Sequence, residues 1–234
     1  MKILFACDLD NTLIHSHKYR REDDICIEIY EGREQSFISR RALDLLKRIS
    51  EKILFIPVTT RSITQYRRIF WTEDFLPRYS VVANGAYLLD GDKQENFLSE
   101  VATPYETEIN RQLASADKNI FTIARIVDES FLFLRCRDDI DPEGISFDTN
   151  LTVQHTGKKI YLFPPLLNKG EALRLLIKRF SPDKVIAAGD SAIDLPMLEV
   201  ADVAFGKKNL RGENFIPFVD AEEFLERILL ATSV

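Results

Sequence analysis

Short apolar runs that alternate with helical stretches constrain the fold of this chain more than any other feature. The runs are residues 2–7, 53–58 and 185–188, and apolar residues recur at helical spacing in 42–49 and 173–180. Runs of four to eight apolar residues are typical of strands buried on both faces. Strands that alternate with amphipathic helices predict a parallel, doubly wound, Rossmann-like α/β sheet.

The pattern changes between residues 84 and 168. Four short strand-like segments and one helical stretch, near residues 105–116, replace the alternation. We expect these residues to form an inserted α+β cap domain, because the turn-forming pairs Asn84-Gly85 and Pro164-Pro165 mark its two ends. The predicted division is a core of residues 1–84 and 166–234 and a cap of residues 85–165.

Composition excludes several classes of protein. With 31 Lys and Arg against 37 Asp and Glu, the net charge is −6, so the chain offers nucleic acid no overall attraction. No stretch approaches the roughly 20 apolar residues that span a bilayer, and the N-terminal apolar run is too short for a signal peptide. Three widely spaced cysteines favour a reducing compartment, and we expect a cytoplasmic protein. The sequence does not indicate the oligomeric state.

Polar clusters stand where the predicted strands end. Ligands of an open parallel sheet bind outside the carboxyl ends of its strands, so residues 8–12, 59–61 and 189–194 should meet at one edge. Lys169 opens a predicted helix, where a cation opposes the helix dipole unless it is exposed or has an anion nearby. The acids expected at this edge are Asp8, Asp10, Asp190 and Asp194. They would repel one another without a hard divalent cation, for which Mg²⁺ is suited, and such a site facing lysine and threonine suits phosphate.

These motifs resemble, in order and spacing, those of the haloacid dehalogenase superfamily. The matching segments are Asp8-Leu-Asp-Asn-Thr12, Thr59 with Arg61, Asn84-Gly85-Ala86, Asn168-Lys169-Gly170 and Gly189-Asp-Ser-Ala-Ile-Asp194. The place of the insertion, after the second motif and before the lysine, resembles subclass IIB, the Cof-type and sucrose-phosphatase-like enzymes. The resemblance implies a Mg²⁺-dependent phosphatase acting on a small phosphorylated metabolite, and we expect a sugar phosphate.

The resemblance also implies a role for each residue. Asp8 is expected to attack phosphorus and form an aspartyl-phosphate, while Asp10 protonates the leaving alcohol and then activates water. Thr59 and Lys169 are expected to bind the phosphoryl group. Thr60 stands where the family usually has glycine, so the choice of donor between Thr59 and Thr60 stays open.

The implied metal ligands are Asp8, the backbone carbonyl of Asp10, and Asp190. Asp194 is a further or water-mediated ligand, and Ile193 replaces an asparagine that often precedes it. Asn11 stands in place of a glycine, and asparagine tolerates the left-handed conformation that this turn requires.

Each feature also has a plainer interpretation. Asp8 and Asp10 would serve to cap a turn, and Lys169 alone would be a solvated surface lysine. We expect Arg61 to pair with a nearby acid, with substrate contact as the alternative. The long segment 15–37 is a candidate flap over the site.

Two other functions stay open. A phosphomutase or phosphotransferase would use the same intermediate, and a non-catalytic protein would only bind a phosphorylated metabolite. In the insert, Arg135 and Arg137 are candidates to meet a second acidic group on the substrate.

Overall fold

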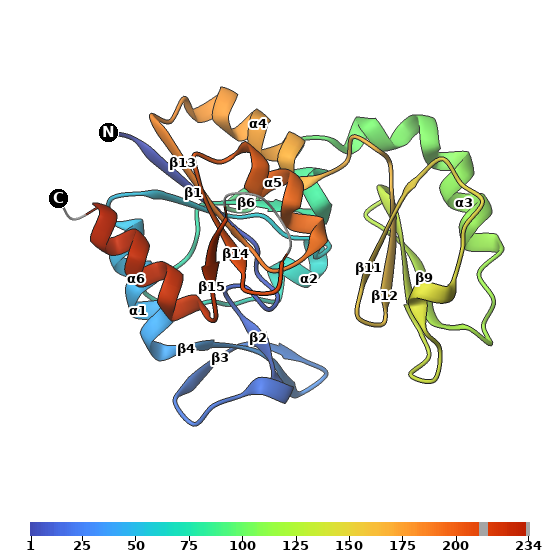
Figure 1. Cartoon of the computed structure of the whole chain (residues 1–234), viewed down its shortest axis with the longest axis horizontal. Helices are drawn as coiled ribbons and strands as arrows, with labels where there is room; N and C mark the ends of the chain where they lie inside the picture. Colours follow the sequence, from blue (N-terminus) through green and yellow to red (C-terminus); the bar gives the residue numbers. More distant parts are fainter. Residues whose placement is uncertain (211–214, 233–234) are drawn as a thin grey trace.

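The computed structural model describes residues 1–210 and 215–232, which form a larger core and a smaller cap (Figure 1). The centre of the core is a parallel sheet in the order β15-β14-β13-β1-β5. Its strands are β1 (Ile3–Cys7), β5 (Leu54–Pro57), β13 (Lys184–Gly189), β14 (Val203–Lys207) and β15 (Ile216–Phe218). The predicted doubly wound α/β fold is confirmed.

Helices cover both faces of this sheet. Phe5 of β1 points to one face and packs in a cluster with Leu46 and Phe224, whereas the adjacent Leu4 packs with Leu173 and Met197 on the other. This alternation explains why the strand reads as a continuous apolar run. The helices on the Phe5 face are α1 (Arg40–Ser50) and α6 (Ala221–Thr232), and those on the Leu4 face are α4 (Lys169–Phe180) and α5 (Leu195–Val200).

Side-chain caps fix where these helices begin. The Ser39 hydroxyl accepts a hydrogen bond from the Ala42 amide at 3.0 Å, and Asn168 Oδ1 accepts one from the Glu171 amide at 2.9 Å. Each bond satisfies an amide that the first helical turn leaves unpaired. The Asn168 cap therefore determines that Lys169 is the first residue of α4.

A second sheet extends the core beyond the predicted boundary at residue 84. It is antiparallel, with strands β6 (Tyr79–Val82), β7 (Tyr87–Asp90) and β8 (Lys93–Asn96). The Thr59 amide bonds the Val81 carbonyl at 2.9 Å, and Leu88 is buried in the cluster that contains Leu4. Residues 87–96, which we predicted in the cap, therefore pack with the core, because the hairpin after β6 buries Leu88 there. The helix that follows β5 is the short α2 (Ile63–Arg67).

The cap is an antiparallel sheet with one long helix. The sheet order is β11-β12-β10-β9, and the elements are α3 (Glu106–Ala114), β9 (Phe121–Val127), β10 (Phe131–Cys136), β11 (Thr152–Thr156) and β12 (Lys159–Phe163). One side of the sheet, including Leu134, is buried in a cluster with Ile109 of α3. The other side places Tyr161 and Phe163 against Leu167 and Ile193 of the core.

A third small sheet follows the first polar cluster. It joins β2 (His15–Ser16), β4 (Arg33–Ser39) and β3 (Asp24–Tyr30), and its hairpin turns at Glu31 and Gly32, both with positive φ. Short 3₁₀ helices complete the fold: η1 (His17–Tyr19), η2 (Ala83–Gly85), η3 (Ser99–Tyr105), η4 (Pro142–Gly144) and η5 (Ala192–Asp194). Within residues 1–210 and 215–232, none of the helices combines the length and the apolar character needed to cross a membrane.

Candidate active site

The order of the strands places two aspartates side by side. The chain adds β5 on one side of β1 and later adds β13 on the other side. The order in which strands are added therefore reverses between β1 and β13. Ligands of such sheets bind at this reversal, outside the carboxyl ends of the strands. Asp8 follows β1 and Asp190 follows β13, and the Asp8 amide bonds the Ala188 carbonyl at 2.9 Å.

Lys169 joins these acids from the first position of α4. Its side chain is 1% exposed, and its Nζ donates to Asp8 Oδ1 at 2.5 Å and to Asp194 Oδ1 at 2.6 Å. Burial lowers the pKa of a lysine, but the two carboxylates outweigh it and raise the pKa of Lys169 above its usual value. The interpretation of Lys169 as a solvated surface lysine is therefore wrong.

Asp194 holds the loop after β13 in shape. Its Oδ2 accepts hydrogen bonds from the amides of Asp190 and Ser191 at 3.1 and 3.0 Å, while Oδ1 is taken by Lys169. A Cβ on Gly189 would lie 2.4 Å from the Asp194 Cβ, so only glycine fits there. Asp194 thus positions both Lys169 and the Asp190 loop, and its role as a metal ligand stays a prediction.

The acids of this edge form a compact group. Asp8, Asp190 and Asp194 each offer a carboxylate oxygen within 4.8 Å of the others. Burial, with the charge of Asp194 adding to it, raises the pKa of Asp190 to about 6, and it raises the pKa of Asp8 against the opposing charge of Lys169. Three carboxylates facing one ammonium leave excess negative charge, which an oxygen-preferring divalent cation such as Mg²⁺ would offset. The donor set therefore fits Mg²⁺.

Asp10 belongs to a separate ion pair. Arg61 donates to both of its carboxylate oxygens, from Nε and Nη2, each at 2.8 Å. Burial would raise the pKa of Asp10, but Arg61 holds it below the usual value. Arg61 thus pairs with an acid, as we expected. The side chain of Asp10 is directed to Arg61. Asp10 is therefore not part of the cluster of three acids formed by Asp8, Asp190 and Asp194.

Glu28 is a site residue that the sequence analysis missed. Its side chain, 3% exposed, accepts from Arg61 Nη1 at 2.8 Å, from the Ser36 hydroxyl at 2.6 Å and from Arg68 Nε at 2.9 Å. The pairing register of β3 shifts on both sides of Glu28, a bulge of the kind that redirects a side chain. The only sequence signal is an acid flanked by Ile27 and Ile29 in a predicted hairpin. The segment predicted as a flap thus also supports Arg61 from β3.

The two candidate threonines have different surroundings. Thr59 is fully buried, and its hydroxyl accepts from the Arg61 amide at 3.2 Å. Thr60 lies beside Tyr161, which reaches the site from the cap and is 7% exposed. Burial raises the pKa of Tyr161 well above its usual value. Tyr161 is a second residue that the sequence analysis missed, and the choice between Thr59 and Thr60 as phosphate donor stays a prediction.

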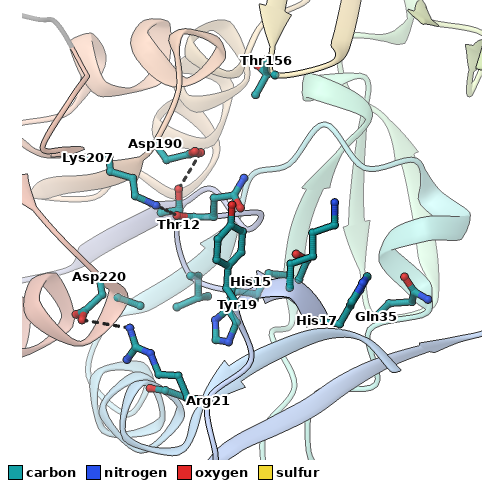
Figure 2. A pocket seen from close by; sticks show the side chains of 18 of the residues that line it. Thr12, His15, His17, Tyr19, Arg21, Gln35, Thr156, Asp190, Lys207 and Asp220 are labelled. Atoms are coloured by element: carbon teal, nitrogen blue, oxygen red, sulfur yellow. Dashed lines mark hydrogen bonds and ion pairs between the residues drawn. The ribbon is translucent and has the colours of Figure 1, made fainter. Parts of the chain in front are cut away.

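A cavity of about 990 Å³ lies beside Asp190 and is lined by residues of both core and cap. The Thr12 hydroxyl donates to Asp190 at 3.3 Å. Figure 2 shows Thr156 on the cap hairpin at one end of the cavity and His15 and Tyr19 toward the other. Asn11 next to Thr12 has a φ of 65°, the left-handed conformation predicted for it. The cavity is large enough for a small metabolite placed against Asp190.

Comparisons with known proteins agree with this architecture. The model of a family described as haloacid dehalogenase-like hydrolase matches residues 99–210. The solved sucrose-phosphatase of Synechocystis sp. PCC6803, in complex with sucrose and phosphate, is 16% identical, with 97% of each chain covered and a TM-score of 0.65. The C-terminal domain of the C. albicans trehalose-6-phosphate phosphatase is 14% identical, covering 100% of this chain and 92% of that chain with a TM-score of 0.68. No curated protein matches the sequence. At these identities the solved structures show a shared fold.

Proposed function

We propose that the chain, of which residues 99–210 match the model of a haloacid dehalogenase-like hydrolase family, is a Mg²⁺-dependent phosphatase that hydrolyses a small phosphomonoester through Asp8. The observation that carries the proposal is Lys169, buried and bonded to Asp8 and Asp194 at 2.5 and 2.6 Å beside Asp190. A buried ammonium beside a carboxylate nucleophile supplies the positive charge that an anionic phosphoryl group needs there. The sucrose and trehalose-6-phosphate phosphatases that share the fold support a sugar phosphate as the substrate.

In the proposed reaction, a carboxylate oxygen of Asp8 forms a bond to phosphorus as the bond to the leaving oxygen breaks. Asp10 gives a proton to that oxygen as the alcohol leaves, and for this step it must first bind a proton and release one of its bonds to Arg61, because Arg61 lowers the pKa of Asp10 in the structure. Asp10 then takes a proton from water as the water attacks the aspartyl-phosphate, which releases phosphate and restores Asp8. Arg61, bonded to both oxygens of Asp10, keeps that carboxyl oriented between the two steps.

The metal would be held by Asp8, the Asp10 carbonyl and Asp190. When bound, Mg²⁺ supplies the positive charge that reduces repulsion between Asp8 and the phosphate. Asp194 is committed to Lys169 and to the amides of the loop, so we assign it the positioning of these ligands.

The proposal is tested with Asp8→Asn, which keeps the shape of the side chain but removes the nucleophilic carboxylate. We expect turnover of p-nitrophenyl phosphate with Mg²⁺ to fall about a thousandfold or more, with an unchanged circular dichroism spectrum. The matched control is Asp148→Asn, an exposed acid of the cap that does not line the cavity. Activity of Asp8→Asn close to that of the wild type would rule out the mechanism.

A further inference from the structure

One side of the cap sheet forms a wall of the cavity. Residues that pair directly across strands share a side of the sheet, and Lys159 of β12 pairs with both Arg135 of β10 and Thr156 of β11. The same side continues to Tyr161, which packs against the core. We call it the cap wall, defined as residues 123, 125, 127, 131, 133, 135, 152, 154, 156, 159, 161 and 163.

The cap wall is positively charged although the whole chain is negative. Among its members, Arg125, Arg135 and Lys159 are cations and none is an acid, whereas the chain carries a net charge of −6. Arg135 and Lys159 both line the cavity. The part of the substrate that meets this wall therefore lies in a locally positive field.

Arg135 and Lys159 stand directly opposite each other on adjacent strands. Like charges in this arrangement destabilise a sheet unless an anion lies between them. Arg135 reaches an acid only at 4.0 Å, in Asp138, whose side chain is 91% exposed. Within the described part of the chain, Lys159 has no ion-pair partner. The positive charges of Arg135 and Lys159 are therefore available to bind an anionic ligand. Arg137, the other candidate, pairs with Asp139 and does not line this cavity.

Two polar atoms on the neighbouring strand also lack partners. The Thr156 hydroxyl and Gln154 Oε1 are buried and, among the residues that the structure describes, make no hydrogen bond. A buried polar atom left unpaired costs free energy, which a ligand hydroxyl would recover. Both residues belong to the cap wall, and Thr156 lines the cavity next to the paired cations (Figure 2).

The same wall lies close to the reacting groups. Lys159 and Arg135 line the same cavity as Asp190 and as Asn11, the residue that follows Asp10. In the proposed reaction, Asp10 protonates the leaving oxygen. Lys159 thus faces the side of the site from which the alcohol leaves, whereas Lys169 faces the phosphoryl group.

We propose that the alcohol portion of the substrate carries a second anionic group, held by Lys159 and Arg135, and a hydroxyl group that bonds Thr156. The substrate class is therefore a phosphorylated polyol or sugar with a carboxylate or a second phosphoryl group. This inference rests on the proposed phosphatase function, because it assigns the leaving group of that reaction.

The test compares kcat/KM for two matched pairs of substrates. Sorbitol 6-phosphate and 6-phosphogluconate differ in a carboxylate, and fructose 6-phosphate and fructose 1,6-bisphosphate differ in a phosphoryl group. We expect the wild type to prefer the anionic member of at least one pair about tenfold or more, and the pair that shows the preference identifies the anion. Because the cations are exposed, the preference should shrink as the salt concentration rises.

Variants then locate the anion. Lys159→Gln and Arg135→Gln should each bring the ratio of the two kcat/KM values toward one, and Thr156→Val should lower kcat/KM for both polyol members. The matched control is Lys118→Gln, an exposed lysine of the cap that does not line the cavity, and its ratio should equal that of the wild type.

The outcomes separate this inference from the proposed function. Turnover of p-nitrophenyl phosphate and of the neutral sugar phosphates without preference in either pair would overturn the inference alone. An anionic preference that Lys159→Gln and Lys118→Gln reduce equally would also overturn it. No turnover of any phosphate ester would overturn both proposals.

Discussion

At the scale of single residues, two buried cations each join a pair of acids. Lys169 bonds Asp8 and Asp194, and Arg61 bonds Asp10 and Glu28. Each cation loses its hydration on burial, and the loss is offset only while both carboxylates are in place. Asp194 and Glu28 therefore hold Lys169 and Arg61 against the two acids to which we assign the chemistry.

Glu28→Gln should destabilise the fold although it preserves size. The substitution removes the charge that faces Arg61 and Arg68, and Arg61 is 11% exposed. Breaking a buried pair in this way should lower the free energy of unfolding by about 3 kcal/mol, measured by urea denaturation.

Glu34→Gln is the matched control for Glu28→Gln. Glu34 lies in the same hairpin and pairs with Arg20 at 2.6 Å, but both side chains are nearly half exposed. It should change the free energy of unfolding by about 0.5 kcal/mol or less. Equal effects of the two variants would show that Glu28 is not an anchor of the Arg61 network.

At the scale of elements, the sequence predicts strands that are buried on both faces, but it misses strands that form only by pairing with a neighbouring strand. Strands β1 and β13 are buried on both faces, so their composition reveals them. In contrast, β8 has the sequence Lys-Gln-Glu-Asn and forms only because β7 pairs with it. Similarly, the strand order explains why Asp8 and Asp190 lie close together. In contrast, the direction of the Glu28 side chain depends on a bulge in β3, which the residue types do not predict.

Helix α3 is anchored in the cap by Glu108. The Glu108 carboxylate accepts from Arg111 at 2.7 Å and from the Thr149 hydroxyl at 2.6 Å, and these bonds, Arg111 first, lower the pKa of Glu108 to about 2. A lowered pKa means stabilisation that is present above the unfolded value of 4.5 and is lost as the pH falls toward 2. Glu108→Gln should therefore reduce the melting temperature at pH 7 and have a smaller effect at pH 3.

The control for this pH dependence is Glu106→Gln, an exposed acid in the first turn of the same helix. Its effect on the melting temperature should be small at pH 7. A Glu108→Gln effect of the same size at both pH values would contradict the anchoring role.

At the scale of the whole molecule, the site exists only in the folded chain. Asp8 and Asp190 are 182 residues apart in the sequence, and the pairing of β1 with β13 brings them together. A metal that binds both residues therefore favours the native state over the unfolded state by mass action. Metal affinity and global stability are coupled in such a protein.

Mg²⁺ should accordingly raise the melting temperature of the wild type by about 5 °C at a hundredfold excess over its Kd, and EDTA should reverse the rise. Asp190→Asn should lose this response, whereas Asp148→Asn should keep it. A separate effect is expected without Mg²⁺ at pH 7.5, where Asp190→Asn should have a higher melting temperature than the wild type. Because burial and then Asp194 raise the pKa of Asp190 to about 6, its ionised form costs the native state stability, so Asp190→Asn should melt above the wild type. Differential scanning fluorimetry measures both effects, and a Mg²⁺ response in Asp190→Asn equal to that of the wild type would exclude Asp190 as a ligand.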